Sequence, residues 1–190
     1  MKYIIDTSSL ISLVRYYLPF DKDDKLFNHI KNMVEVGQII VIDKVVRECG
    51  YVSRGIVVNK MPFICLKKSL NTSDVVALQP KRNFNLVNNQ FCRKSLLKNA
   101  SPEDVVKYEQ NKKRFTDIEA DLSIVLLAEK LAGRNTLTPD DITVVSEETR
   151  YDSDNKYFKK IPEMCEILNI PCSTVSEFLK EINPSSTFVF

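Results

Sequence analysis

Apolar residues along this chain form short unbroken runs that alternate with helix-spaced stretches. Uninterrupted runs at residues 3–5, 38–43 and 141–146 predict buried strands, because both faces of such strands must be covered. The stretches between them carry apolar residues three and four positions apart, which indicates helices. Strands joined by helices predict an α/β fold class, a three-layer α/β/α domain with a central parallel sheet.

The expected helices share this spacing, and glycines or proline mark several of their ends. They are predicted at residues 9–18, 25–37, 44–50, 116–133, 159–170 and 173–182. Asp43 is expected to begin the third of them, and Gly37, Gly50 and Gly133 are expected to end helices. The helix at residues 159–170 leads into residues 171–175.

The segment 51–116 is less regular. Residues 56–66 are predicted to be extended, residues 71–79 to form a short capped helix, and residues 99–113 to form a helix that Ser101 caps. Because the apolar content is thin, we predict an insertion within one domain that spans residues 1–182. Residues 183–190 are expected to be a C-terminal tail.

Charge is distributed unevenly. The chain has a formal net charge of +2, yet residues 51–116 hold 13 Lys and Arg against 4 Asp and Glu. Such asymmetry indicates contact with nucleic acid, whereas a solvated basic face is the simpler alternative. The candidate phosphate contacts are Lys81, Arg82, Arg93 and Lys94. Aromatic side chains interleave with these cations and could stack bases, although several must belong to the core: Tyr51, Phe63, Phe84, Phe91, Tyr108 and Phe115.

Several classes of protein lack their signatures here. Only four glycines are present, and none forms a dinucleotide-binding or P-loop motif. No GxSxG motif occurs. The five cysteines are scattered without a CxxC pair, which predicts reduced thiols and no zinc site. No signal peptide or membrane span is expected, so a cytoplasmic location without a membrane partner is predicted.

Carboxylates recur near the predicted strand ends. Asp6 follows the first strand, Glu48 lies on the helix after the second, and Glu147 and Glu148 follow the third. Asp121 lies on the helix before the third strand, on the stripe that Ile124, Val125 and Ala128 share, and Thr116 to Glu119 fits a capping box. Each acid has a structural alternative; Asp6 could cap a helix, and Glu48 could pair with Lys44.

Carboxylates gathered at one sheet edge repel one another unless a cation neutralises them. Oxygen ligands suit Mg²⁺ and Mn²⁺, which bind phosphates and activate water. The sequence therefore predicts a Mg²⁺ or Mn²⁺ site and hydrolysis of phosphodiester bonds.

The motifs "YIIDTSSLI", "VVRECG", "EADLSIVLLA" and "TVVSEE" resemble those of the PIN-domain family of metal-dependent nucleases, which includes the toxins of VapBC-type toxin–antitoxin pairs. This resemblance implies an endoribonuclease that acts on RNA, and it allows for a small antitoxin partner and a homodimer. It implies that the catalytic residues are Asp6, Glu48, Asp121 and Glu148, that the metal ligands are Asp6, Asp121 and Glu148, and that Ser8 and Ser146 contact the substrate. Ser8 stands where many members have Asn, and Glu147 competes with Glu148 for the last acidic position.

Other classes fit less well. A haloacid-dehalogenase-type phosphatase needs a second acid where Ser8 stands, and a response-regulator receiver needs an acidic pair at the same strand end. The stronger alternative is a catalytically degraded PIN-like module that binds RNA or regulates a partner.

Overall fold

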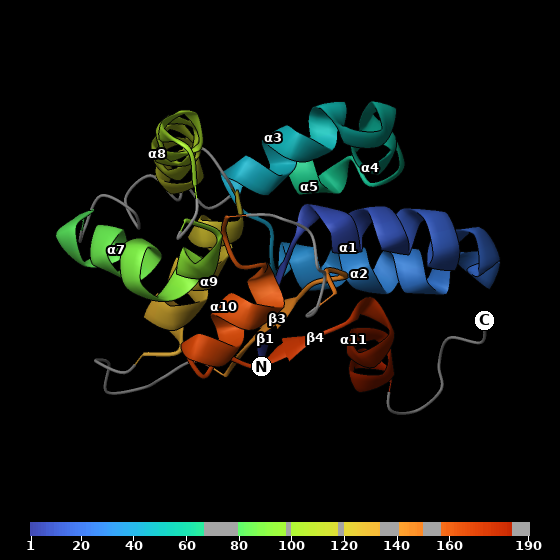
Figure 1. Ribbon diagram of the computed structural model, residues 1–190. Coiled ribbons are helices and arrows are strands. Elements are labelled where there is room, and N and C mark those ends of the chain that lie inside the picture. Colours follow the sequence, from blue (N-terminus) through green and yellow to red (C-terminus); the bar gives the residue numbers. More distant parts are fainter. Residues whose placement is uncertain (67–79, 98–99, 118–119, 134–140, 150–156, 184–190) are drawn as a thin grey trace.

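Four short strands lie at the centre of the protein and helices surround them (Figure 1). The computed structural model describes residues 1–66, 80–97, 100–117, 120–133, 141–149 and 157–183. The strands are β1 (Lys2–Ile5), β2 (Ile39–Ile40), β3 (Ile142–Val145) and β4 (Cys172–Ser173). The α-helices are α1 (Thr7–Ser12), α2 (Lys25–Glu35), α3 (Asp43–Tyr51), α4 (Ile56–Lys60), α5 (Phe63–Leu66), α7 (Pro80–Leu86), α8 (Pro102–Asp117), α9 (Ala120–Leu131), α10 (Ile161–Ile167) and α11 (Val175–Ile182).

The sheet has the order β2-β1-β3-β4, and every neighbouring pair is parallel. β1 lies against β3 with Ile4 opposite Val144 and Ile5 opposite Val145. All of these side chains are buried, as unbroken apolar runs require when both faces of a sheet are covered. The predicted α/β class with a central parallel sheet is therefore confirmed.

Helices cover both sides of the sheet. Figure 1 shows α9 and α10 on one side and α1, α2 and α11 on the other. On the α11 side, the rings of Tyr3 and Phe178 meet edge to face with centroids 4.8 Å apart. On the other side, Ile124, Val125 and Ala128 of α9 are fully buried. The predicted apolar stripe of α9 therefore lies in the core.

Helix ends agree with the predicted boundaries in part. Gly37 follows α2 with a φ of 77° and donates its N–H to the Val34 carbonyl at 3.2 Å, so the predicted glycine cap is confirmed. α3 begins at Asp43 as predicted. Gly50, in contrast, lies inside α3, which ends one residue later at Tyr51, so the predicted stop at Gly50 is wrong.

The middle segment is more helical than its sequence indicates. Residues 56–66 form α4 and α5, so the predicted extended conformation is wrong. Val57, Phe63 and Ile64 are buried there, because short helices can bury a β-branched run as well as a strand can when tertiary packing favours it. The short helix predicted for residues 71–79 lies outside the described residues.

Backbone contacts attach the middle segment to the chain before α10. Cys92 forms an antiparallel bridge with Phe158. The Arg93 N–H donates to the Tyr157 carbonyl at 2.8 Å, and the Lys159 N–H donates to the Phe91 carbonyl at 2.8 Å. The Arg93 guanidinium also forms an ion pair with Glu163 of α10 at 2.6 Å. These contacts hold residues 91–93 beside the entry to α10.

Most aromatic rings of the middle segment belong to the core. Phe115 of α8 stacks on Phe158 with centroids 4.5 Å apart, and Tyr108 packs against the same ring. Phe63 and Phe91 are also buried, whereas Tyr51 and Phe84 are 68% and 47% exposed. Only the latter two of the six rings therefore have an exposed face of the size that stacking on a base needs.

The two long helices α8 and α9 follow one another in the sequence. α8 runs through Thr116 to Asp117 and α9 begins at Ala120, so the predicted single helix over residues 116–133 starts later than expected. Glu119 of the predicted capping box lies outside the described residues. The assignment of residues 1–182 to one domain stays a prediction, and the expected tail lies almost wholly outside the described part of the chain.

None of the five cysteines forms a disulfide, as predicted. Among the described helices, none combines the length and the apolar character needed to cross a membrane.

The edge-to-face pair in the core gives the first testable prediction. Phe178→Ala removes a fully buried ring against Tyr3 and should lower the free energy of unfolding by about 3–5 kcal/mol. Phe20→Ala is the matched control: this ring is 64% exposed, so its loss should change stability by about 0.5 kcal/mol or less. Urea unfolding followed by circular dichroism measures both. Equal effects of the two substitutions would contradict this placement of α11.

Candidate functional site at the carboxyl edge of the sheet

Asp6 lies where β1 ends and α1 begins. Its backbone is extended, its N–H donates to the Val145 carbonyl at 3.2 Å, and its side chain accepts the Ser9 N–H at 2.7 Å. Asp6 is therefore the N-cap of α1, which was the structural alternative in the sequence. The cap uses only one carboxylate oxygen, Oδ1, so it does not account for the whole side chain.

Two hydroxyl groups donate to the other oxygen of Asp6. Ser8 Oγ lies 2.8 Å from Oδ2, and Ser146 Oγ, at the end of β3, lies 2.9 Å from it. The Glu148 N–H in turn donates to Ser146 Oγ at 3.2 Å. The predicted hydroxyl positions Ser8 and Ser146 thus meet at the same carboxylate, from segments 138 positions apart in the sequence. Parallel pairing of β1 and β3 produces this meeting, because their carboxyl ends share one edge.

Burial dominates the electrostatics of Asp6. The residue is 4% exposed, and this desolvation raises the pKa of its carboxyl group above the ordinary value. The hydrogen bonds from Ser9, Ser8 and Ser146 act in the opposite direction but do not cancel the effect of burial. A nearby positive charge would stabilise the ionised form of such a carboxylate.

Glu48 reaches this edge through Thr7. Thr7 Oγ1 donates to Glu48 Oε2 at 2.6 Å, which joins α3 to the first residue of α1. The next residue on α3, Cys49, is fully buried; its burial and then the charge of Glu48 raise the pKa of the thiol to about 12. Cys49 therefore stays neutral, and the groups near Asp6 that can bind a cation are oxygens.

The two acids after β3 both bind helix N-termini. Glu148 Oε2 accepts the N–H of Ile161, the first residue of α10, at 2.9 Å. Glu147 Oε1 accepts the N–H of Val175, the first residue of α11, at 2.6 Å. Glu147 is exposed and Glu148 is half-buried, and only Glu148 also binds Ser146 through its backbone. This difference favours Glu148 over Glu147 as the acid that belongs with Asp6.

Asp121 lies in the first turn of α9 and is half-buried. The body of that helix packs on β1 and β3, and Ala120 beside it is buried. Asp121 therefore stands at one end of the core helix that covers the central strands.

The predicted phosphate contacts divide into two kinds. Arg82 binds both carboxylate oxygens of Glu129 on α9, one of them at 2.9 Å. Arg93 is paired with Glu163, and both side chains are largely buried. Lys81 and Lys94 are exposed, and Lys94 donates to the Asn89 amide oxygen at 3.3 Å. The structure thus gives the two arginines structural partners and leaves the two lysines facing solvent.

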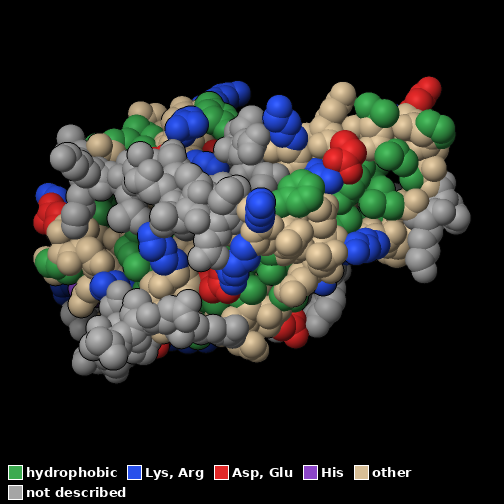
Figure 2. Space-filling model, turned by 90° about the vertical axis from the view of Figure 1, so that its left-hand side faces the viewer, with side chains coloured by type: hydrophobic (Ala, Val, Ile, Leu, Met, Phe, Trp, Pro, Cys, Tyr) green, Lys and Arg blue, Asp and Glu red, His purple; other side chains and the backbone are tan. Residues whose placement is uncertain are grey.

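Figure 2 shows the face of the molecule on which α7 and α8 lie. Lys and Arg side chains are spread over the visible part of this face, with fewer Asp and Glu among them. On the described residues visible there, the basic side chains are scattered singly and do not form one continuous patch.

The donor atoms near Asp6 fit a hard divalent ion in chemistry. They are carboxylate and hydroxyl oxygens, which Mg²⁺ and Mn²⁺ prefer. Within the part of the chain that the structure describes, no three His, Cys, Asp or Glu side chains are grouped as an all-protein metal cage would need. Mg²⁺ does not require such a cage, since it commonly binds one or two carboxylates and keeps waters and substrate phosphates as its other ligands.

The sequence did not identify Thr7 as the hydrogen-bond donor to Glu48, or Ser9 as the residue that joins α1 to β3. Ser9 is fully buried and its hydroxyl donates to the Val145 carbonyl at 3.1 Å. The only signal was the run of three hydroxyl residues after Asp6. Thr7, Ser8 and Ser9 donate to three different acceptors, and the sequence could not show which hydroxyl binds which acceptor.

Part of the chain matches a known protein family. Residues 3–56 match the model of a family described as a domain of unknown function (DUF4411). This stretch contains β1, α1, α2, β2 and α3, and hence both Asp6 and Glu48. No curated protein matches the chain.

The buried carboxylate predicts a pH effect on stability. Because burial raises the pKa of Asp6, the native state binds its proton more tightly than the unfolded state does. In EDTA, the contribution of Asp6 is therefore most favourable when the group is protonated. It falls as the pH rises from about 4, the unfolded value, through the higher folded value. The free energy of unfolding of the wild type should decline relative to that of Asp6→Asn, which does not titrate.

Urea unfolding between pH 4 and 8 measures this difference. Asp6→Ala should lie about 1 kcal/mol below Asp6→Asn throughout, because alanine cannot cap α1. Glu35→Gln removes an exposed carboxylate and controls for the general loss of one negative charge. A wild type that gains stability over Asp6→Asn with rising pH would contradict the assigned sign.

Proposed function

We propose that this protein is a divalent-metal-dependent endoribonuclease that hydrolyses RNA phosphodiester bonds at the carboxyl edge of its sheet. The observation that carries the proposal is the buried Asp6 carboxylate. It receives hydroxyl groups from Ser8 and Ser146, and its neighbour Thr7 holds Glu48 at the same edge. A helix cap needs one carboxylate oxygen and no second acid, so this arrangement exceeds what capping requires.

By the family resemblance, Asp6, Asp121 and Glu148 are the residues that would surround Mg²⁺ or Mn²⁺. Because no three acids are grouped within the described residues, the ion would bind one or two of these carboxylates directly, with waters and substrate phosphates as its other ligands. When bound, such an ion would lower the pKa of a coordinated water and neutralise charge that develops on the phosphate. The remaining steps belong to the chain. Ser146 and Ser8 fix the direction of the Asp6 carboxylate, and Thr7 fixes that of Glu48, which would accept a proton from the attacking water.

Exposed cations on the same chain supply affinity for a polyanion. Lys81 and Lys94 face solvent beside helices that carry further Lys residues, and phosphate contacts of this kind require no fixed partner on the protein. RNA is the substrate class that the family resemblance implies. The role of a toxin held by a small antitoxin, and a homodimer, rest on that resemblance alone.

A second candidate is a PIN-like module that binds RNA or regulates a partner without cleaving. The observation in its favour is that Glu147 and Glu148 each bind a helix N-terminus, so both have a structural use without a metal. The two candidates differ in one property, the dependence of RNA cleavage on metal and on Asp6.

Cleavage assays distinguish the candidates. Purified protein should cut a structured RNA in Mg²⁺ or Mn²⁺, and EDTA should abolish the reaction. Asp6→Asn and Asp121→Asn should each lower kcat/KM at least 100-fold, because both remove a carboxylate that would bind the ion. Folding of each variant is checked by its melting temperature in EDTA, which for Asp6→Asn should not fall.

The acids after β3 provide the matched comparison. Glu148→Gln should lower cleavage strongly, whereas Glu147→Gln should leave it within about threefold, because only Glu148 joins the Asp6–Ser146 network. Both substitutions remove a carboxylate from a helix N-terminus, so their costs in stability should be similar. Cleavage that survives EDTA, or that is equal in wild type and Asp6→Asn, would refute the metal-dependent mechanism.

The basic residues give a separate prediction about salt. Lys81→Gln and Lys94→Gln should each flatten the dependence of log Kd on log salt concentration by about 0.7 for a single-stranded RNA. Arg82→Gln should change the slope less, because its guanidinium is already paired with Glu129. Binding is measured in EDTA to prevent cleavage. Slopes that are unchanged in both lysine variants would indicate a solvated basic face.

A further inference from the structure

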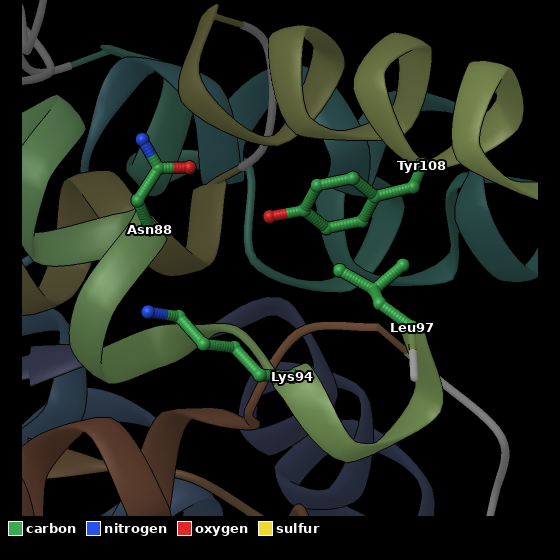
Figure 3. Close-up of a pocket in the computed structure, with 4 residues that line it drawn as sticks. All are labelled: Asn88, Lys94, Leu97 and Tyr108. Carbon is green, nitrogen blue, oxygen red and sulfur yellow. The ribbon is translucent and has the colours of Figure 1, made fainter. Parts of the chain in front are cut away.

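An open pocket of about 420 Å³ lies between residues 88–97 and α8. Its described lining consists of Asn88 from the helical turn Val87–Phe91, Lys94 and Leu97 from the turn Lys94–Leu97, and Tyr108 from α8. Figure 3 shows the Lys94 ammonium and the Asn88 amide on one side of the space, with Leu97 and the Tyr108 ring on the other. The Tyr108 hydroxyl points into the space between them, so the apolar side consists of Leu97 and the carbon edge of the Tyr108 ring.

The apolar side is rigid. Tyr108 is 6% exposed, and its ring packs against the rings of Tyr157 and Phe158 with centroids 5.6 and 5.8 Å away. The Lys112 ammonium lies 5.3 Å from the centre of the same ring. A ring held on several sides cannot turn away when a ligand enters, so the Tyr108 edge is a fixed wall beside Leu97.

The polar side is electropositive. Lys94 is exposed and makes one hydrogen bond, 3.3 Å long, to the Asn89 amide oxygen, which leaves further N–H groups of the ammonium for a ligand. The described lining includes no acid. Glu109, the acid whose charge acts on Tyr108, is itself paired with Lys112 at 2.6 Å.

We propose that this pocket binds one unstacked nucleotide of a single RNA strand. The base contacts Leu97 and the edge of the Tyr108 ring without stacking on its face, the Asn88 amide bonds to the base edge, and Lys94 binds the adjacent phosphate. An amide offers both a donor and an acceptor to a base edge, and specific recognition of RNA uses splayed bases held in this way. The volume is within the range of small-ligand pockets. This assignment rests on the proposed ribonuclease function, for which it supplies a substrate subsite.

The pocket is joined to the carboxyl edge of the sheet through the first turn of α10. Arg93, next to Lys94, binds Glu163 in that turn. Glu148, which belongs to the Asp6 network, binds the N–H of Ile161 in the same turn. The pocket and the acids are thus connected through one helical turn, and an RNA strand that occupies both would have its register at the cleavage position set by the pocket.

Binding of short labelled RNAs to the Asp6→Asn protein in EDTA tests the pocket without any cleavage. The Asp6→Asn protein with its pocket residues unchanged should bind A-, C- and U-rich octamers with unequal affinities. Lys94→Gln should weaken all of them about tenfold, and Asn88→Ala should reduce the differences among them. The matched controls are Lys81→Gln, an exposed lysine outside the pocket lining, and Asn28→Ala, an exposed asparagine on α2. Melting temperatures confirm that each variant is folded.

The outcomes separate the pocket from the proposed function. If Lys94→Gln weakens binding no more than Lys81→Gln does, and Asn88→Ala leaves base preference unchanged, the pocket does not bind a nucleotide. The same conclusion holds if no octamer binds. If the protein cleaves RNA but gives either of these negative binding results, the proposed function stands and the nucleotide pocket is refuted. If Lys94→Gln and Asn88→Ala have the expected effects on binding but the protein never cleaves RNA, the nucleotide pocket stands and the nuclease mechanism is refuted.

Discussion

The hydrogen bond between Ser146 and Asp6, 2.9 Å long, connects two strand ends that the sequence separates by 140 positions. It forms only because β1 and β3 are parallel neighbours in register, so that both strands end at the carboxyl edge of the sheet. The Asp6 carboxylate then joins two segments: it caps α1 and receives Ser8 on the first turn of that helix, and it receives Ser146 from the end of β3.

The same carboxylate has an energetic cost. Burial raises its pKa, and the three hydrogen bonds that favour its ionised form only partly offset the desolvation. Natural sequences commonly keep such a group where a function requires it, since replacing it would otherwise improve stability. Cys49 lies nearby with a thiol that burial keeps neutral, so the environment of Asp6 has oxygen donors and no thiolate. A hard divalent ion is the partner that this combination suits.

Much of the fold could be predicted from the sequence, and the reasons for the failures are physical. Unbroken apolar runs bounded by polar residues correctly predicted β1 and β3, and Gly37, which tolerates a positive φ, correctly predicted the end of α2. The prediction of an extended conformation for residues 56–66 was wrong because a short β-branched run fits a buried helix as well as a strand. At the site, acidic positions were visible, but the partners of Arg82 and Arg93 were not, since ion pairs between distant segments leave no local pattern.

Titration calorimetry with Mn²⁺ tests the central claim most directly, because it needs neither a known RNA nor a partner. The account predicts one Mn²⁺ site per chain in the wild type that is lost or strongly weakened in Asp6→Asn and Asp121→Asn and retained in Glu147→Gln. Glu147→Gln keeps the Asp6–Ser146 network and changes only the exposed acid at α11. Equal heats of binding in the wild type and Asp6→Asn, or no saturable binding at all, would show that the carboxyl edge of this sheet holds the fold together without binding a metal.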